Sequence, residues 1–171
     1  GEPLAAGSTL MEYTLQEQRD QAEYMVKSQI LLQSMGVERD FSFIFRPYNE
    51  TNIAWGMLRW DYTPKIAYAA FANLTAKLVG CKYLGEVKLG SGIRAFLYQQ
   101  KDKKQTLVFW SDKGGSFKLS NISKKIYKAD LVGGEIVISG NIIKADKYPA
   151  YIRNLTGLKI DVSVKPIVKS E

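Results

Sequence analysis

Residues 55–68 read Trp55-Gly56-Met57-Leu58-Arg59-Trp60-Asp61-Tyr62-Thr63-Pro64-Lys65-Ile66-Ala67-Tyr68, a loop that runs into a helix. Thr63 and Pro64 predict the helix cap and a first-turn proline, because the missing proline N–H has no helical partner in that turn. The helix is expected to run to Val79. The loop before it is predicted to start at Arg46, and loops this long inside compact domains are usually functional.

Upstream of this loop the pattern predicts a helix and then a strand. Thr14-Leu15-Gln16-Glu17 fits a capping box, apolar residues then recur at spacings of three and four, and Gly36 provides a left-handed stop. We therefore expect a helix over about 14–35. The short apolar run Phe41-Ser42-Phe43-Ile44-Phe45 is typical of a strand covered on both faces, as in a parallel sheet.

From Cys81 onward the hydrophobic period changes to that of strands. Short β-rich runs separated by turn signals occupy residues 93–98, 105–110, 116–119, 126–128, 135–138, 141–143, 150–152 and 158–162. This pattern predicts a small antiparallel β-sandwich. The chain is thus expected to be α+β, with a helix-strand-helix part in residues 1–80 and a sandwich in residues 81–171.

Composition excludes several chemistries. The 171 residues are 46% hydrophobic and 24% charged, as in ordinary globular proteins. The chain has no histidine, which excludes a Ser-His-Asp triad and a His-ligated zinc site, and its single cysteine excludes an internal disulfide. We expect no metal and no cofactor. Apolar runs fall short of the roughly 18 residues of a membrane span, so no membrane partner is expected.

Charge is unevenly distributed along the chain. Residues 1–80 carry 7 Lys and Arg against 9 Asp and Glu, a net of −2, whereas residues 81–171 carry 17 against 8, a net of +9. The lysines of the second half lie in turns or alternate with apolar residues. That placement favours the solvated face and protected edges of a sheet over a nucleic-acid surface.

The order of these motifs resembles the C-terminal part of (β/α)8-barrel retaining glycoside hydrolases, the large clan of β-xylosidase-like families. Residues 55–68 are similar to the passage that closes such barrels, and residues 17–26 and 35–41 to the preceding helix and the start of the eighth strand. Residues 106–112, 128–134 and 148–152 resemble the sandwich appended to them. The resemblance covers nearly the whole chain.

This resemblance implies a function and a limitation. The parent enzyme would hydrolyse O-glycosidic bonds by a retaining double displacement between two carboxylates. A complete barrel takes about 250 residues, so residues 1–80 would hold only its last segment, and both catalytic carboxylates would precede Gly1. The isolated chain is therefore expected to be inactive. The resemblance also implies an extracellular or periplasmic location, which the residues themselves leave open.

Two alternatives remain open at this stage. Asn49-Glu50 resembles the pair that carries the acid/base in these enzymes, so Glu50 is a catalytic candidate if Phe41–Phe45 were the fourth strand. The pair follows Arg46-Pro47 and lacks the next proline, which favours a solvated or arginine-paired carboxylate. Alternatively, the chain is a non-catalytic carbohydrate-binding or structural sandwich module.

The resemblance implies carbohydrate as the ligand, and aromatic faces in the loop would suit the C–H surfaces of sugar rings or, alternatively, pack the loop against the sandwich. The substrate-binding candidates are the loop residues Arg46, Tyr48, Asn49, Glu50, Trp55 and Trp60. A strand at Phe41–Phe45 with unpaired edges would be an aggregation hazard. We therefore expect the missing N-terminal barrel segment, or another copy of the chain, to cover it.

Overall fold

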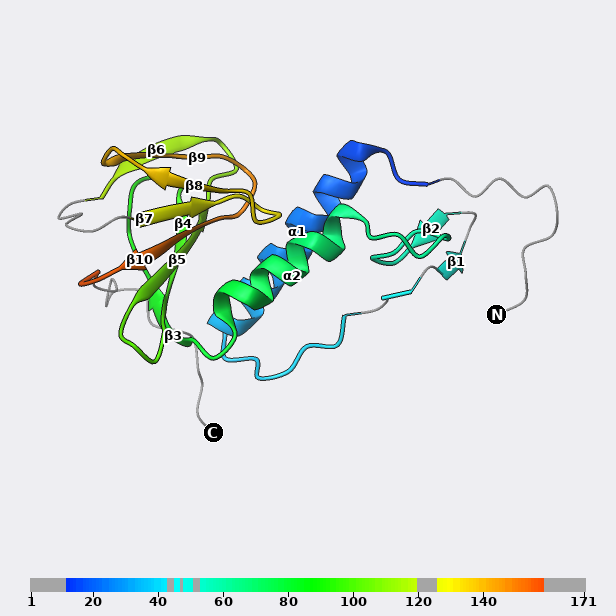
Figure 1. Ribbon diagram of the computed structural model, residues 1–171, viewed down its shortest axis with the longest axis horizontal. Helices are drawn as coiled ribbons and strands as arrows, with labels where there is room; N and C mark the ends of the chain where they lie inside the picture. The colour runs from blue at the N-terminus through cyan, green and yellow to red at the C-terminus, as the bar shows by residue number, and fades with distance from the viewer. Residues whose placement is uncertain (1–11, 43–44, 47, 51–52, 120–125, 159–171) are drawn as a thin grey trace.

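The computed structural model describes residues 12–42, 45–46, 48–50, 53–119 and 126–158, with 48–50 and 53–54 described by their backbone alone (Figure 1). Helix α1 spans Leu15–Ser34. The Thr14 hydroxyl accepts the Glu17 N–H at 3.2 Å, and the Glu17 carboxylate accepts the Thr14 N–H at 2.7 Å, which confirms the capping box. Gly36, at φ +84°, ends the helix as expected.

Helix α2 spans Ile66–Leu78, but it does not begin where the sequence pattern placed it. Lys65 is the N-cap residue and makes no side-chain cap bond, so the predicted cap at Thr63-Pro64 is wrong. Pro64 instead forms a backbone bridge with Leu58, and the Thr63 hydroxyl donates to Asp61. Thr63 and Pro64 thus belong to the turn that begins at Leu58, and they do not cap the helix.

The strand predicted at Phe41–Phe45 is not observed in its described residues. Phe41, Ser42 and Phe45 belong to no strand, and residues 43–44 lie outside the described part. The reason is physical: a strand needs a neighbour to receive its backbone hydrogen bonds, and no described strand pairs with this segment. The predicted loop contains an antiparallel hairpin, β1 Tyr48–Glu50 and β2 Ile53–Trp55.

The second half of the chain forms the expected antiparallel sheets. Six strands, ordered β3-β4-β5-β10-β7-β8, make the larger sheet, and two more make a small one, β6-β9. The larger sheet consists of β3 Lys82–Glu86, β4 Arg94–Gln99, β5 Gln105–Trp110, β7 Ile126–Ala129, β8 Glu135–Ile138 and β10 Ala150–Leu155. The small sheet consists of β6 Gly115–Lys118 and β9 Ile142–Ala145.

Two details depart from the predicted strand pattern. β3 was not predicted, because a register shift between Tyr83 and Gly85 breaks its alternation. Of the strand predicted at 158–162, Leu158 is outside any strand, and residues 159–162 lie outside the described part.

The hydrophobic core lies on both faces of the larger sheet. On one face Phe96, Tyr98 and Trp110 pack against α1 and α2, which contribute Val26 and Ala70 among others. On the other face the core includes Leu97, Leu107 and Phe109 and is closed by Phe117 and Ile143 of the small sheet. Because β5 is covered on both faces, all its residues are buried. The result is three layers: helices, six-stranded sheet and two-stranded sheet.

Figure 1 shows the helix pair between the sandwich and the β1–β2 hairpin. The core between the helices and the six-stranded sheet contains residues from both sides of position 80. One continuous core therefore joins the two halves of the chain, and a division into two domains at residue 80 stays a prediction that unfolding experiments can test.

Candidate functional site

A groove of about 800 Å³ lies between α1 and the segments that precede and follow the hairpin. Two aromatic side chains with exposed faces line it: Tyr24 of α1 is 77% exposed and Trp55 at the end of β2 is 41% exposed. Tyr13 meets Trp55 edge to face, with ring centroids 6.3 Å apart. Exposed aromatic rings of this kind provide flat apolar surfaces for a ligand.

Gly56 positions Trp55 in this groove. Gly56 has φ +101°, and a Cβ at this position would collide with the Arg46 carbonyl. Next to it, the Met57 N–H donates to the Phe45 carbonyl at 3.1 Å, and the Lys65 N–H donates to the Met57 carbonyl at 2.9 Å. Only glycine lets the two chain segments approach this closely. This close approach therefore fixes the direction in which the β1–β2 hairpin extends from the helices.

Arg59 and Asp61 lock the turn that follows the hairpin. The Arg59 guanidinium donates to the Pro64 carbonyl at 2.7 Å and to Gln18 Oε1 at 3.1 Å. The Asp61 carboxylate accepts the N–H and the hydroxyl of Thr63, and these bonds hold the pKa of Asp61 below its ordinary value. These residues of the 55–68 stretch thus have a structural role.

Of the residues predicted to bind substrate, Trp55 lines the groove. Arg46 is exposed, and its backbone packs against Gly56. Trp60 is partly buried and outside the groove lining, and its indole N–H is buried without a hydrogen-bond partner among the described residues. The backbones of Tyr48, Asn49 and Glu50 form β1, while their side chains lie outside the described part, so the role of Glu50 stays untested.

Sequence reasoning missed the contribution of α1 to the groove, namely Tyr24 and Gln21, and the support that Lys65 gives to Tyr13. The Lys65 side chain is buried, with Nζ 4.9 Å from the Tyr13 ring centroid and 3.9 Å from Glu12 Oε2. Burial lowers the pKa of Lys65, opposed by the Glu12 charge. The sequence signal that could have revealed the contribution of α1 was Tyr24, an aromatic residue on the polar face of a predicted helix.

The carboxylates of the groove suit hydrogen-bond acceptance better than proton donation. Hydrogen bonds from Thr14 lower the pKa of Glu17, and the hydrogen bond from Lys147 lowers the pKa of Asp20. Both are therefore ionised at neutral pH and act as acceptors only. A general acid of a glycosidase needs a raised pKa. The groove can thus hold hydroxyl groups, and neither carboxyl is adjusted for acid catalysis.

The Asp20–Lys147 contact, 2.8 Å long, predicts a measurable titration shift. Because the pKa of Asp20 is depressed in the folded protein, its contribution to stability is present above the ordinary value of about 3.9 and is lost as pH falls through the lower, folded value. Carbon NMR titration should therefore give Asp20 a pKa below about 3.9, and Lys147→Met should raise this pKa toward the ordinary value. An unchanged midpoint in Lys147→Met would show that this contact is not formed in solution.

Within the described ranges, no three acidic or cysteine side chains come together in a way that could hold a metal ion. No described helix is long and apolar enough to cross a membrane. The sequence matches no family model, and no curated protein matches it significantly. A relationship to glycoside hydrolases therefore stays an expectation from the sequence motifs.

Proposed function

We propose that this chain is the C-terminal part of a glycoside hydrolase, which hydrolyses O-glycosidic bonds with two carboxylates located upstream of Gly1. Residues 1–80 form the last segment of its (β/α)8 barrel, and the sandwich braces that segment. The groove at Trp55 faces the carbohydrate. By itself the chain is inactive.

The observation that carries this proposal is the arrangement of α1 and α2. The two helices run side by side in the same direction, and the chain between them returns in the opposite direction along the pair (Figure 1). Gln29 of α1 donates to Ser42 in that return segment, and the Phe45 and Tyr68 rings lie 5.8 Å apart. In a (β/α)8 barrel, consecutive helices run parallel and are joined by a β-strand that returns in the opposite direction, and the segment between α1 and α2 takes the place of such a strand.

The exposed rings of the return segment support the same proposal. Phe41 is 87% exposed and Phe45 is 51% exposed, although the sequence pattern is that of a buried strand. In a complete barrel the neighbouring strands and helices cover such side chains on both faces. The missing N-terminal barrel segment is the partner that suits them, and a second copy of the chain is the alternative.

A second candidate function, a non-catalytic carbohydrate-binding module, is favoured by the groove itself. Tyr24 and Trp55 offer exposed rings, and the ionised Glu17 and Asp20 accept hydrogen bonds from hydroxyl groups. This function needs no residue upstream of Gly1. The two candidates therefore differ in whether turnover appears when the upstream segment is present.

The test is hydrolysis of a panel of aryl glycosides by two proteins. We expect no turnover by the present chain, and turnover once the coding sequence is extended upstream to include an Asn-Glu pair and a Thr-Glu pair. Glu50→Gln should leave the extended enzyme active, as should the control Glu38→Gln at an exposed site away from the hairpin.

Turnover by the present chain that Glu50→Gln abolishes would overturn the proposal and assign Glu50 as the acid. An extended protein without turnover on any glycoside would also reject the hydrolase. Binding of oligosaccharides that Trp55→Ala removes would then leave the binding module as the function.

A further inference from the structure

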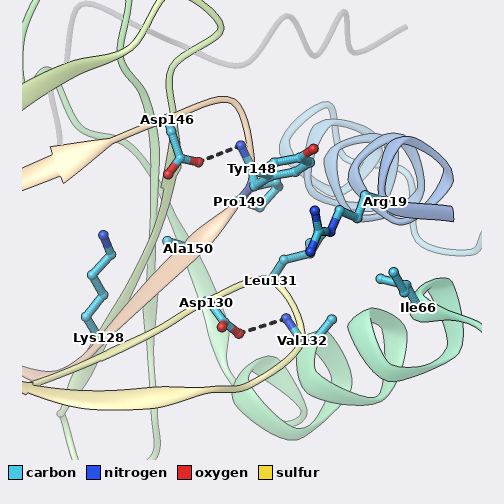
Figure 2. A pocket seen from close by; sticks show the side chains of 10 residues that line it. All are labelled: Arg19, Ile66, Lys128, Asp130, Leu131, Val132, Asp146, Tyr148, Pro149 and Ala150. Atoms are coloured by element: carbon cyan, nitrogen blue, oxygen red, sulfur yellow. Dashed lines mark hydrogen bonds between the residues drawn. The ribbon is translucent and has the colours of Figure 1, made fainter. Parts of the chain in front are cut away.

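A second cavity, of about 370 Å³, lies where the helices meet the sandwich, apart from the groove at Trp55 (Figure 2). Four segments line it: α1, the start of α2, the β7–β8 turn and the β9–β10 connection. We call it the junction cleft. Its volume is at the lower end of the roughly 300–1,000 Å³ of ligand pockets, which suits a ligand of about one ring.

Arg19 is the available cation of the junction cleft. Figure 2 shows its guanidinium reaching from α1 toward Leu131. Throughout the described ranges, Arg19 has no hydrogen-bond or ion-pair partner. The other cation, Lys128, is engaged elsewhere: its Nζ donates to the Lys144 carbonyl at 3.1 Å and lies over the Phe109 ring. A guanidinium without a partner is suited to a planar carboxylate, which it can bind through two parallel hydrogen bonds.

Two carboxylates of the cleft are fixed through one oxygen each. Asp130 Oδ1 accepts the N–H groups of Val132, Gly133 and Gly134 at 2.8–3.0 Å. Asp146 Oδ1 accepts the Tyr148 N–H at 2.9 Å. The second oxygen of each accepts no hydrogen bond from a described residue. Both groups are therefore held in place with an acceptor to spare, which is what a ligand with hydroxyl groups needs.

Tyr148 and its neighbours provide the apolar part of the cleft. Lys147 Nζ lies 4.8 Å from the centre of the Tyr148 ring, and the phenol oxygen accepts from Gln16 Nε2 at 3.0 Å. The ring is therefore held at the cleft wall, beside Leu131 and Pro149. Such a surface packs against the C–H groups of a saturated ring.

We propose that the junction cleft binds a sugar ring that carries a carboxylate, such as a uronic acid. The carboxylate pairs with Arg19, the hydroxyl groups donate to Asp130 and Asp146, and the ring lies against Tyr148. A phosphate fits less well, because its second charge would be repelled by the two aspartates. The proposal depends on the chemistry of the cleft alone and holds whether or not the chain belongs to a hydrolase.

The test is a titration of the isotope-labelled full chain with glucuronic acid and with galacturonic acid, followed by amide NMR and calorimetry. We expect saturable binding with a Kd of about 1 mM, shifts at Val132 and Gly133, and at least tenfold weaker binding of neutral glucose. Binding should weaken with salt. Digalacturonate shows where the bound sugar ring comes from. Tighter binding than that of the monomer indicates a unit within a polymer, and equal binding indicates a terminal unit.

Arg19→Gln should weaken uronate binding about tenfold, whereas Arg39→Gln, an exposed arginine away from the cleft, should leave it unchanged. Arg19 is exposed, so both variants should melt as the parent does. The proposal is overturned by equal binding of glucose, by tighter binding of the zwitterion γ-aminobutyrate, or by wild-type affinity in Arg19→Gln. It is also overturned by shifts confined to Tyr24 and Trp55, or by no saturation at about ten times the expected Kd.

Discussion

Phe96→Ala is expected to lower the free energy of unfolding by about 3–5 kcal/mol, and to do so for the helices and the sandwich together. Phe96 is completely buried on the sheet face that packs against α1 and α2. Its ring stacks on Trp110, with centroids 5.1 Å apart. Truncation removes buried apolar surface and leaves a cavity in a core that both halves of the chain share, so the loss cannot be confined to one of them.

Denaturant unfolding followed by two signals measures this effect. The helical circular dichroism reports α1 and α2, and amide exchange in β5 reports the sheet. Both should show one transition, shifted equally in the variant. Ile136→Ala is the matched control, because Ile136 is 64% exposed and its truncation should cost less than about 1 kcal/mol. Two separate transitions would show instead that residues 1–80 and 81–171 are independent domains.

Gly56→Ala is expected to destabilise the protein by about 3 kcal/mol, roughly twice the loss expected for Gly80→Ala. Both glycines have positive φ, +101° at Gly56 and +70° at Gly80, so alanine is strained at each by roughly 1–2 kcal/mol. Their surroundings differ. A Cβ at Gly80 meets no atom within 4 Å, whereas at Gly56 it collides with the Arg46 backbone, which cannot move away as a flexible side chain can.

Urea unfolding of the two variants makes this comparison, with the indole N–H resonance of Trp55 as a local probe of the groove, because the fluorescence of the three tryptophans overlaps. In Gly56→Ala the Trp55 resonance should shift in the folded protein, because the approach of Phe45 to Met57 is disturbed. In Gly80→Ala it should not. Equal losses in the two variants would mean that the close approach at Arg46 is not maintained in solution.

Local patterns in the sequence predicted the elements that depend on local forces. The capping box at Thr14 and the stop at Gly36 mark the ends of α1, since both act within a few residues. Most strands of the sandwich followed from alternation and turn signals. The strand predicted at Phe41–Phe45 is not observed in its described residues, because a strand depends on neighbours that local patterns do not contain.

Local sequence patterns were limited in the same way for the candidate sites. Trp55 was predicted, because an aromatic residue in a long loop is conspicuous in the sequence. Tyr24 and Arg19 were not, because each is a single residue on a helix that otherwise resembles a solvated face. They acquire a role only when the hairpin approaches Tyr24 and the β7–β8 turn approaches Arg19.

The sequence by itself determined the α+β composition, the ends of the first helix, the antiparallel sandwich and the absence of histidine chemistry. The tertiary structure alone decided that α1 and α2 pack on the sandwich, so that a single core crosses residue 80. The physical reason is that alternation along a strand shows which side chains share a face, but not which layer covers that face. The layer is selected by long-range packing, and the same packing forms the groove and the junction cleft.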